Sequence, residues 1–574
     1  MNKKHLFLSA ALFAVACNCG AQSLNKEITV ERDIVPEYRD ADRLRISPVV
    51  SLPQVVRQNL TYSFVDRPVG VTPSIYPLAL QAPAIERNDQ FPGYAAIGYM
   101  PLFNMAASAG YRFIDNDKTR LGAWLQYNGI TYHGDVASLT AGTKEKTMLR
   151  RHTFTLGSKL RQSTGEQSWL DAQIDYTYSR YNLPAYTLTE GGALTRNQAV
   201  NNLNVAAGWR HEDKSAFSYG AGAGFSRFAF VHGSDELFYN RYYDAAAARQ
   251  SNFTVNGDAS LAFSDESTVS LGLDFSYLKG NDSFRYYIDG MPAGLLPTDL
   301  NTWLLRLTPG YHYTGANAAF DAGVRIDLTH GSGRAFHIAP DVRFSATPSP
   351  YFGFTVKAGG GEVQNSLASL FAVMPYMSQI HTYGNSHIPF TFDASVTVGP
   401  FKGAYAELFG GYARANDWLM PGYFHSGVLQ AFNVRGWHGG LALGYRHGKL
   451  AQARVSAEVA RSNSEDAGKG YYLWRDRARN VLDASVKVNP VERLSVDLGF
   501  TLRTGRRICH IYDGASPAIT LGDVRDLSAG ISYRITPALT VFVNGENLLN
   551  HRYSTVDYFE SQGITGLAGA SLKF

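Results

Sequence analysis

The sequence predicts an all-β fold, a transmembrane antiparallel β-barrel of about 22 strands. Three observations support this prediction. Apolar and polar residues alternate with a period of two from about residue 93 onward, and short polar turns alternate with longer loops. The chain of 574 residues is also rich in glycine (55 residues) and aromatic residues (13%) but poor in charged ones (18%). This composition excludes disordered, coiled-coil and collagen-like chains.

The first 21 residues have the organisation of a signal peptide. Lys3 and Lys4 precede an apolar stretch over residues 6–16, which is too short to span a bilayer, and Ala21 precedes the expected cleavage point. A second interpretation is a lipoprotein signal that leaves Cys17 as a lipidated first residue. After cleavage at residue 21 only Cys509 remains of the three cysteines, so no intrachain disulfide is expected.

Residues 22–92 are expected to form an extended proline-rich arm. Seven prolines lie between residues 22 and 90, and proline disrupts both helix interiors and central strands. Two further interpretations are open, one for the start of the arm and one for the whole arm. Residues 26–31 (KEITVE) could add a strand to the sheet edge of a partner, or the whole segment could be a disordered leader.

The alternation of residues 268–278 illustrates the expected barrel wall. Val269, Leu271, Leu273, Phe275 and Tyr277 share one strand face, and serine, glycine and aspartate share the other, because successive side chains point to opposite faces. A soluble sandwich also alternates, but its polar face is usually rich in Lys and Glu. Here the polar faces carry Gly, Ser, Thr, Asp and Arg, and the apolar faces often end in Tyr or Trp. Lipid outside and a wet lumen inside are therefore expected.

Connection lengths give the strand count. Ten short turns each join two strands, and one more strand at each end brings the total to about 22 over residues 93–574. Longer loops lie between the short turns, so the short turns are expected on the periplasmic side and the loops outside the cell. The short turns are expected near residues 115–117, 162–165, 212–214, 264–267, 314–317, 347–350, 400–402, 446–449, 489–492 and 536–538.

The C-terminus supports location in the outer membrane of a Gram-negative cell. The chain ends on Phe574, with Leu572 and Gly569 before it. This Gly-x-x-apolar-x-aromatic pattern resembles the signal that the barrel-insertion machinery reads. That machinery and outer-membrane lipid are therefore the expected partners. The near-neutral balance of 53 basic and 49 acidic residues gives no indication of nucleic-acid binding.

Residues 539–553 carry a family resemblance. The alternating segment LTVFVNG runs into Asn547, Leu548, Leu549, Asn550 and Tyr553, which resembles the penultimate-strand signature of TonB-dependent receptors. The resemblance covers residues 93–574 and implies a transport or receptor role with an unknown ligand. It also implies TonB, or another periplasmic or surface protein, as a partner. The motif itself is expected to be structural, in the last external loop.

The arm departs from this family pattern. Family members carry a globular plug before the barrel, whereas residues 22–92 show no plug-like pattern, and residues 26–31 would at most be a degenerate TonB-binding box. A barrel of this size without a plug leaves a wide lumen. The arm, inward-folded loops or a separate protein are the candidates to fill it.

Two external loops are candidates for binding. One carries an aromatic and basic cluster of Phe238, Tyr239, Arg241, Tyr242 and Tyr243, residue types that dominate recognition surfaces. The alternative is aromatic packing at the membrane interface. The other loop, residues 364–385, carries an apolar run that would line a constriction or meet a partner; its candidate residues are Leu370, Phe371, Met374 and Tyr376.

Charges expected on the lumen face are of both signs, which argues against a strongly selective ion filter. They are Asp171, Asp175, Asp274, Asp321, Arg325, Asp327, Asp483, Lys487, Asp497, Arg503 and Arg534.

No catalytic, cofactor or metal constellation stands out, because the 15 histidines are scattered and no H-E-x-x-H, C-x-x-C or Walker motif occurs. The first hypothesis is a receptor or transport barrel and not an enzyme. The alternative is a non-transporting plugless barrel that acts as a scaffold or subunit of an outer-membrane assembly. A hydrolase barrel is disfavoured because no Ser-His pair can be placed.

Overall fold

The computed structural model describes most of the chain from residue 91 onward. The described ranges are 91–100, 104–137, 144–183, 196–213, 217–238, 241–245, 247–280, 283–288, 291–297, 301–331, 335–373, 375, 384–421, 429–464, 478–508, 519–556 and 559–574. The expected signal peptide and nearly all of the arm lie outside these residues.

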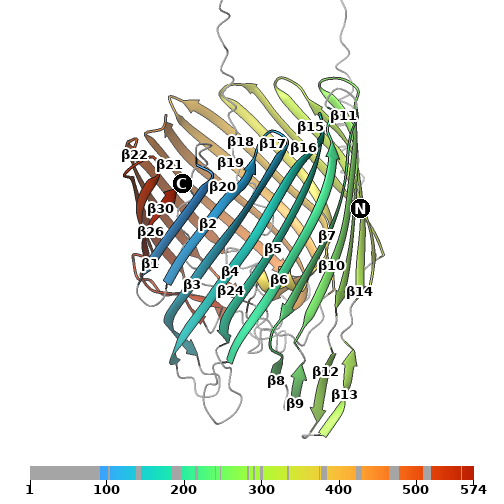
Figure 1. The fold of residues 1–574 in the computed structure, drawn as a ribbon, viewed down its shortest axis with the longest axis vertical. Helices are drawn as coiled ribbons and strands as arrows, with labels where there is room; N and C mark the ends of the chain where they lie inside the picture. Colours follow the sequence, from blue (N-terminus) through green and yellow to red (C-terminus); the bar gives the residue numbers. More distant parts are fainter. Residues whose placement is uncertain are drawn as a thin grey trace, which may run out of the picture. The chain divides into compact units, whose positions relative to one another are not determined.

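Within the described residues, 22 long strands form a closed antiparallel sheet in which each strand pairs with its neighbours in the chain (Figure 1). The first strand also pairs with the last, with Gly98 opposite Gly569, and this pairing closes the barrel. The predicted fold class and strand count are confirmed. The barrel strands are β1 (Gly93–Met100), β2 (Asn104–Asp115), β3 (Thr119–Ala137), β4 (Lys144–Gly165), β5 (Ser168–Leu183), β6 (Arg196–His211), β7 (Phe217–Phe230), β10 (Arg249–Ala262), β11 (Ser267–Gly280), β14 (Asn301–Thr314), β15 (Ala318–His330), β16 (Phe336–Ser349), β17 (Phe352–Val363), β18 (Ser386–Phe401), β19 (Ala404–Pro421), β20 (Leu429–His447), β21 (Ala451–Ser464), β22 (Asn480–Val491), β23 (Leu494–Thr504), β26 (Val524–Arg534), β27 (Leu539–Glu546) and β30 (Thr565–Lys573).

The short turns fall close to where the sequence places them. β2 and β3 are joined by residues 116–118, and β26 and β27 by residues 535–538. Three are displaced: residues 162–165 lie wholly within β4, and residues 347–349 and 489–491 belong to β16 and β22, so these turns follow at 166–167, 350–351 and 492–493. The register of β4 against β5 shifts between Ser163 and Gly165, so a bulge carries the polar end of the strand past the expected stop.

The long connections at the opposite end contain further short strands. β8 (Ser234–Phe238), β9 (Arg241–Ala245), β12 (Ser283–Ile288) and β13 (Met291–Pro297) form a separate four-stranded sheet beyond the barrel rim (Figure 1). Smaller pairs are β24 (Arg507–Ile508) with β25 (Ile519–Thr520) and β28 (Ser554–Val556) with β29 (Phe559–Glu560).

The barrel wall has an apolar outer face and a polar inner face. On β11, Val269 is 41% exposed, Leu271 52% and Leu273 38%, although these are large apolar side chains. On the opposite face of the same strand Ser270 shares a hydrogen bond with His312 of β14 at 2.6 Å, a Ser-His pair that the sequence did not reveal. Lipid contact explains the exposed apolar belt, and closure of the sheet lets neighbouring strands pair their backbone groups inside the membrane.

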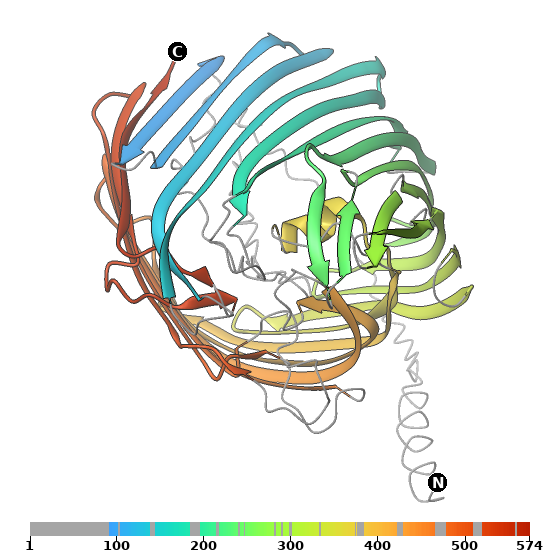
Figure 2. The ribbon, with the colours of Figure 1, turned by 90° about the horizontal axis from the view of Figure 1, so that it is seen from below.

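A short helix lies inside the barrel. α2 (Leu367–Val373) belongs to the connection between β17 and β18, and Figure 2 shows it within the ring of strands. Within the part of the chain that the structure describes, no helix combines the length and hydropathy needed to cross a membrane.

Candidate functional site in the barrel lumen

The inner wall is lined by cross-strand ion pairs. Arg161 and Asp171 lie 2.7 Å apart on β4 and β5, and Arg454 and Glu407 lie 2.9 Å apart on β21 and β19. Further pairs join Arg210 to Asp258, His312 to Asp321 and Lys487 to Asp497. Each of the four Arg or Lys pairs joins a cation to an anion, so these pairs make the inner wall polar without adding a net charge.

The β17–β18 connection is anchored to the inner wall before α2 begins. Gln364 accepts a hydrogen bond from Ser276 of β11 at 2.7 Å and donates one to Thr302 of β14 at 3.2 Å. The backbone N–H of Leu367 donates to Gln250 of β10 at 2.7 Å. Ser366 caps the helix, since its hydroxyl accepts from the N–H of Ser369 at 3.1 Å. The described start of the connection therefore lies against the inner wall instead of extending away from the membrane.

Apolar packing holds α2 in place. Phe371 lies 5.3 Å, 5.7 Å and 6.0 Å, between ring centroids, from Phe228, Tyr181 and Phe230. The guanidinium of Arg151 lies 5.7 Å from the Phe371 ring centroid, a favourable cation–π contact. Leu367, Leu370 and Leu429 complete this buried cluster, to which β5, β6, β7 and β20 contribute.

A glycine bulge changes the direction of side chains at the end of β17. Phe352 faces outward, so counting by two would also place Glu362 on the outer face. The register against β18 shifts between Gly359 and Gly361, and Gly361 has a φ of +119°, a conformation suited to glycine. A Cβ on Gly361 would also lie 2.8 Å from the Asp327 carboxylate. The bulge therefore turns Glu362 to the inner side, opposite His387 of β18.

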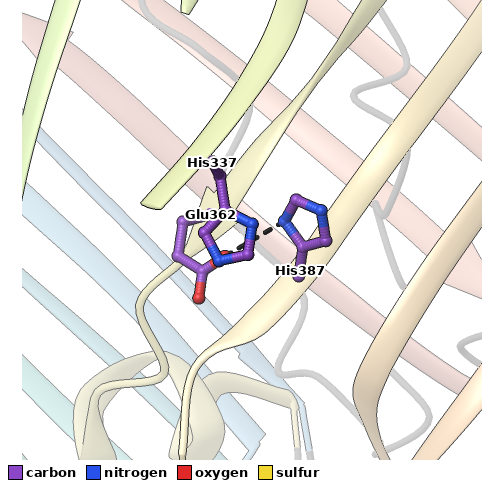
Figure 3. A group of neighbouring side chains, drawn as sticks. All are labelled: His337, Glu362 and His387. Carbon is purple, nitrogen blue, oxygen red and sulfur yellow. Dashed lines mark hydrogen bonds and ion pairs between the residues drawn. The ribbon is translucent and has the colours of Figure 1, made fainter. Parts of the chain in front are cut away.

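Glu362 lies between two histidines (Figure 3). Its Oε2 is 3.3 Å from Nε2 of His337 on β16 and 3.1 Å from Nδ1 of His387. The two imidazole rings stack with centroids 3.9 Å apart. The side chain of Glu362 is 1% exposed, that of His337 4% and that of His387 15%. One ligand atom from each residue lies within 4.8 Å of the other two, so this group could hold a metal ion.

A buried ion pair supports the cluster from the neighbouring strands. Arg306 of β14 donates to both carboxylate oxygens of Asp327 on β15, at 2.7 and 3.0 Å. The same carboxylate accepts from the backbone N–H of Glu362 at 2.6 Å, and Arg306 donates to the Glu362 carbonyl at 2.6 Å. The charge of Asp327 is thus balanced by Arg306, and both residues fix the backbone of Glu362.

Sequence reasoning missed this cluster. His337 and His387 occupy inward positions of an ordinary alternation, because Phe336, Ile338 and Phe390 are exposed to lipid on the other face. The signal that could have identified the site is the Gly359–Gly360–Gly361 run next to Glu362. A glycine run within a strand indicates a bulge.

The structure describes part of each of the two candidate binding loops. Leu370 and Phe371 are buried in the α2 cluster, whereas Met374 and Tyr376 lie outside the described residues. Phe238 pairs with Arg241 across the β8–β9 hairpin. Tyr242 and Tyr243 pair by backbone register with Tyr287 and Tyr286 of β12. Tyr239 lies outside the described residues, and a binding role for either loop remains a prediction.

The family motif forms a tight turn after β27. Asn547 is 4% exposed and, like Asn550, has a positive φ. Its side chain donates to the carbonyls of His551 and Gln562 at 3.1 and 2.8 Å and accepts from the His551 N–H at 3.0 Å. The side chain of Asn550 accepts from the N–H of Ile564 at 3.2 Å. These bonds fix the loop backbone, and asparagine tolerates the left-handed conformation that they require.

Leu548 and Leu549 of this turn are exposed, whereas Tyr553 packs further along the loop. The Tyr553 ring lies beneath the guanidinium of Arg506, 5.9 Å from its centroid. Burial, followed by the nearby Asp526 carboxylate, raises the pKa of Tyr553 above its ordinary value.

The C-terminal pattern lies at the seam of the barrel. Gly569 pairs with Gly98 of β1, and Leu572 and Phe574 face outward with about half of their surface exposed. The backbone N–H of Gly93 donates to the Phe574 carbonyl at 2.8 Å. Recognition of these residues by the insertion machinery remains a prediction.

Solved structures share this fold, although no family model and no curated protein matches the chain. The ferric yersiniabactin uptake receptor FyuA from Yersinia pestis has a TM-score of 0.63 at 12% identity, over 84% of this chain and 80% of that chain. The FrpB iron transporter from Neisseria meningitidis has a TM-score of 0.60 at 10% identity, over 84% and 81%. The copper transporter OprC has a TM-score of 0.59 at 9% identity, over 84% and 79%. At these identities the comparison shows the fold alone: the described chain forms the same 22-stranded barrel fold as these outer-membrane receptors and transporters, as its resemblance to TonB-dependent receptors implied.

Proposed function

We propose that this protein is an outer-membrane receptor or transporter whose lumen is gated by the β17–β18 loop. The observation that carries the proposal is the position of α2 inside the barrel, held by Phe371 against three aromatic side chains of the wall. A barrel of this width needs an internal obstruction to remain impermeable. Structural neighbours that are a ferric yersiniabactin uptake receptor, an iron transporter and a copper transporter support a transport role with an unknown ligand.

A protein partner on either side of the membrane belongs to the same proposal. The family resemblance supports TonB on the periplasmic side, with residues 26–31 as the candidate contact. A neighbouring receptor, FpvAI, has been solved in complex with pyocin S2, which supports a surface protein as an external partner. We propose no catalytic activity, in keeping with neighbours that are receptors and transporters.

Conductance in planar bilayers tests the gating role. We expect wild-type protein to be almost silent and a variant with residues 366–384 replaced by a short Gly-Ser linker to conduct steadily, because α2 is removed. The matched control replaces residues 465–475, in another long connection at the same end, and should remain silent.

A second candidate function is a non-transporting scaffold. The four-stranded sheet of β8, β9, β12 and β13 favours it, because this sheet projects beyond the rim where a partner could dock (Figure 1). The scaffold would be favoured over the transporter if the α2-deleted variant did not conduct and another envelope protein co-purified stably through the projecting sheet.

A further inference from the structure

We propose that His337, Glu362 and His387 form a binding site for one divalent transition-metal ion of the zinc class. The three side chains come from adjacent strands, β16, β17 and β18, and converge on one inward-facing point near the long-loop end (Figure 3).

Two of the three ligand spacings match such an ion, and the third lies within 4.8 Å. Zinc bonds of about 2.0–2.1 Å in a tetrahedral arrangement place neighbouring ligand atoms about 3.3–3.4 Å apart. The carboxylate oxygen of Glu362 lies 3.3 Å from the His337 nitrogen and 3.1 Å from the His387 nitrogen. Three protein ligands of this kind leave a fourth position for water or for another ligand.

The donor set selects the class of metal. Two imidazoles and one carboxylate suit zinc and its neighbours in the first transition row. Calcium takes six to eight oxygen ligands, and magnesium keeps several waters in an octahedral shell, so neither matches a buried pair of imidazoles. The His387 side chain is 15% exposed, so the cluster is not fully closed to solvent.

Charge burial supports the same conclusion. A carboxylate that is 1% exposed is costly unless a cation compensates it. Arg306 is already paired with both oxygens of Asp327. A divalent ion would balance Glu362 and bind both histidines in their neutral form, which is the form that ligates metals.

The position of the site gives the ion a structural consequence. Glu362 and His387 are cross-strand partners at the two ends of the connection that carries α2. A metal bound between them would fasten the base of this loop, where it enters the lumen. The inference does not depend on the proposed transport role, since it concerns the loop base alone.

Zinc titration of the full-length barrel without a polyhistidine tag tests the proposal. Protein in detergent is stripped with a chelator and titrated calorimetrically with Zn²⁺, and bound metal is counted after gel filtration. We expect one ion per chain. Glu362→Gln and His387→Asn should each weaken zinc binding by more than about 100-fold. Each variant removes a metal ligand, which costs more affinity than changing a residue that only hydrogen-bonds to a ligand. His312→Asn alters another inner-wall histidine–carboxylate pair and should leave binding unchanged.

Cobalt(II) separates a defined site from surface binding. The wild-type barrel should give the intense ligand-field bands of a four-coordinate site, and Glu362→Gln should lose them. Heat-modifiable gel mobility checks that each variant is folded. A folded wild type that binds no zinc would show a purely hydrogen-bonded His–Glu–His cluster and overturn the proposal. Equal binding by the wild type and the folded variants would overturn it as well.

Discussion

Gly569 shows how much the barrel seam depends on one missing side chain. It pairs with Gly98 of β1 on one side and with Phe542 of β27 on the other. A Cβ at this position would lie 2.6 Å from both the Gly98 Cα and the Phe542 ring. The two neighbouring strands approach too closely to accept a methyl group. Glycine in the C-terminal pattern therefore has a packing role in addition to its predicted role in recognition.

Gly569→Ala is expected to destabilise the barrel by about 1–3 kcal/mol, because overpacking must push the seam apart. Urea unfolding in lipid vesicles, followed by heat-modifiable gel mobility, measures this change. Gly439→Ala is the matched control, since its Cβ would meet nothing nearer than 3.7 Å. Equal midpoints for the two variants would show that the seam accommodates the methyl group.

At the scale of elements, α2 links distant parts of the wall. It is short, seven residues, and an isolated helix of this length is unstable in water. Its order depends on the apolar cluster with β5, β7 and β20 and on the hydrogen bond from Leu367 to Gln250. Loss of the cluster should therefore release the loop without unfolding the barrel wall.

Phe371→Ala is expected to cost about 3–5 kcal/mol of local packing, as for other buried aromatic truncations. Limited proteolysis of folded barrel should then cut within residues 364–385, whereas wild-type protein resists. Phe263→Ala removes the same side chain from the outer face, where it is 67% exposed, and should not change the cleavage pattern. Protection of the loop in both variants would contradict a packing role for Phe371.

The features that the sequence could predict depend on residues close together in the chain. Those that it could not predict depend on contacts between residues far apart in the chain. Alternation and turns are local, so Leu271 and Leu273 could be placed outward and the turn at 535–538 found from sequence alone. The position of α2 depends on Phe371 meeting Tyr181 and Phe228, which lie far away in the chain. Glu362 could not be placed because the bulge at Gly359–Gly361 reverses the alternation before it.

At the scale of the whole molecule, the wall separates hydrocarbon from a polar lumen. The apolar belt on β11 faces outward, and ion pairs such as Arg161–Asp171 line the inside. Substitutions of the same chemistry should therefore have opposite consequences on the two faces.

Leu273→Arg is expected to cost about 2–4 kcal/mol of folding stability near the bilayer midplane, since a charge would enter hydrocarbon. Asn256→Arg provides the matched control, because Asn256 lies on the inner face opposite Asp274 and a new cation there gains an acidic neighbour. Folding yields into vesicles of defined lipid should fall for the first variant only. A comparable loss for both would contradict the assignment of faces.

The β1–β30 pairing also constrains biogenesis. β1 is made early and β30 last, so the edge of β1 has no permanent partner until translation and export of the chain are complete. A topology with so large a contact order folds slowly, and an unpaired strand edge is prone to aggregation in the meantime. The exported chain is therefore expected to need protection from aggregation until β30 pairs with β1, and any product truncated before β30 should be degraded rather than inserted.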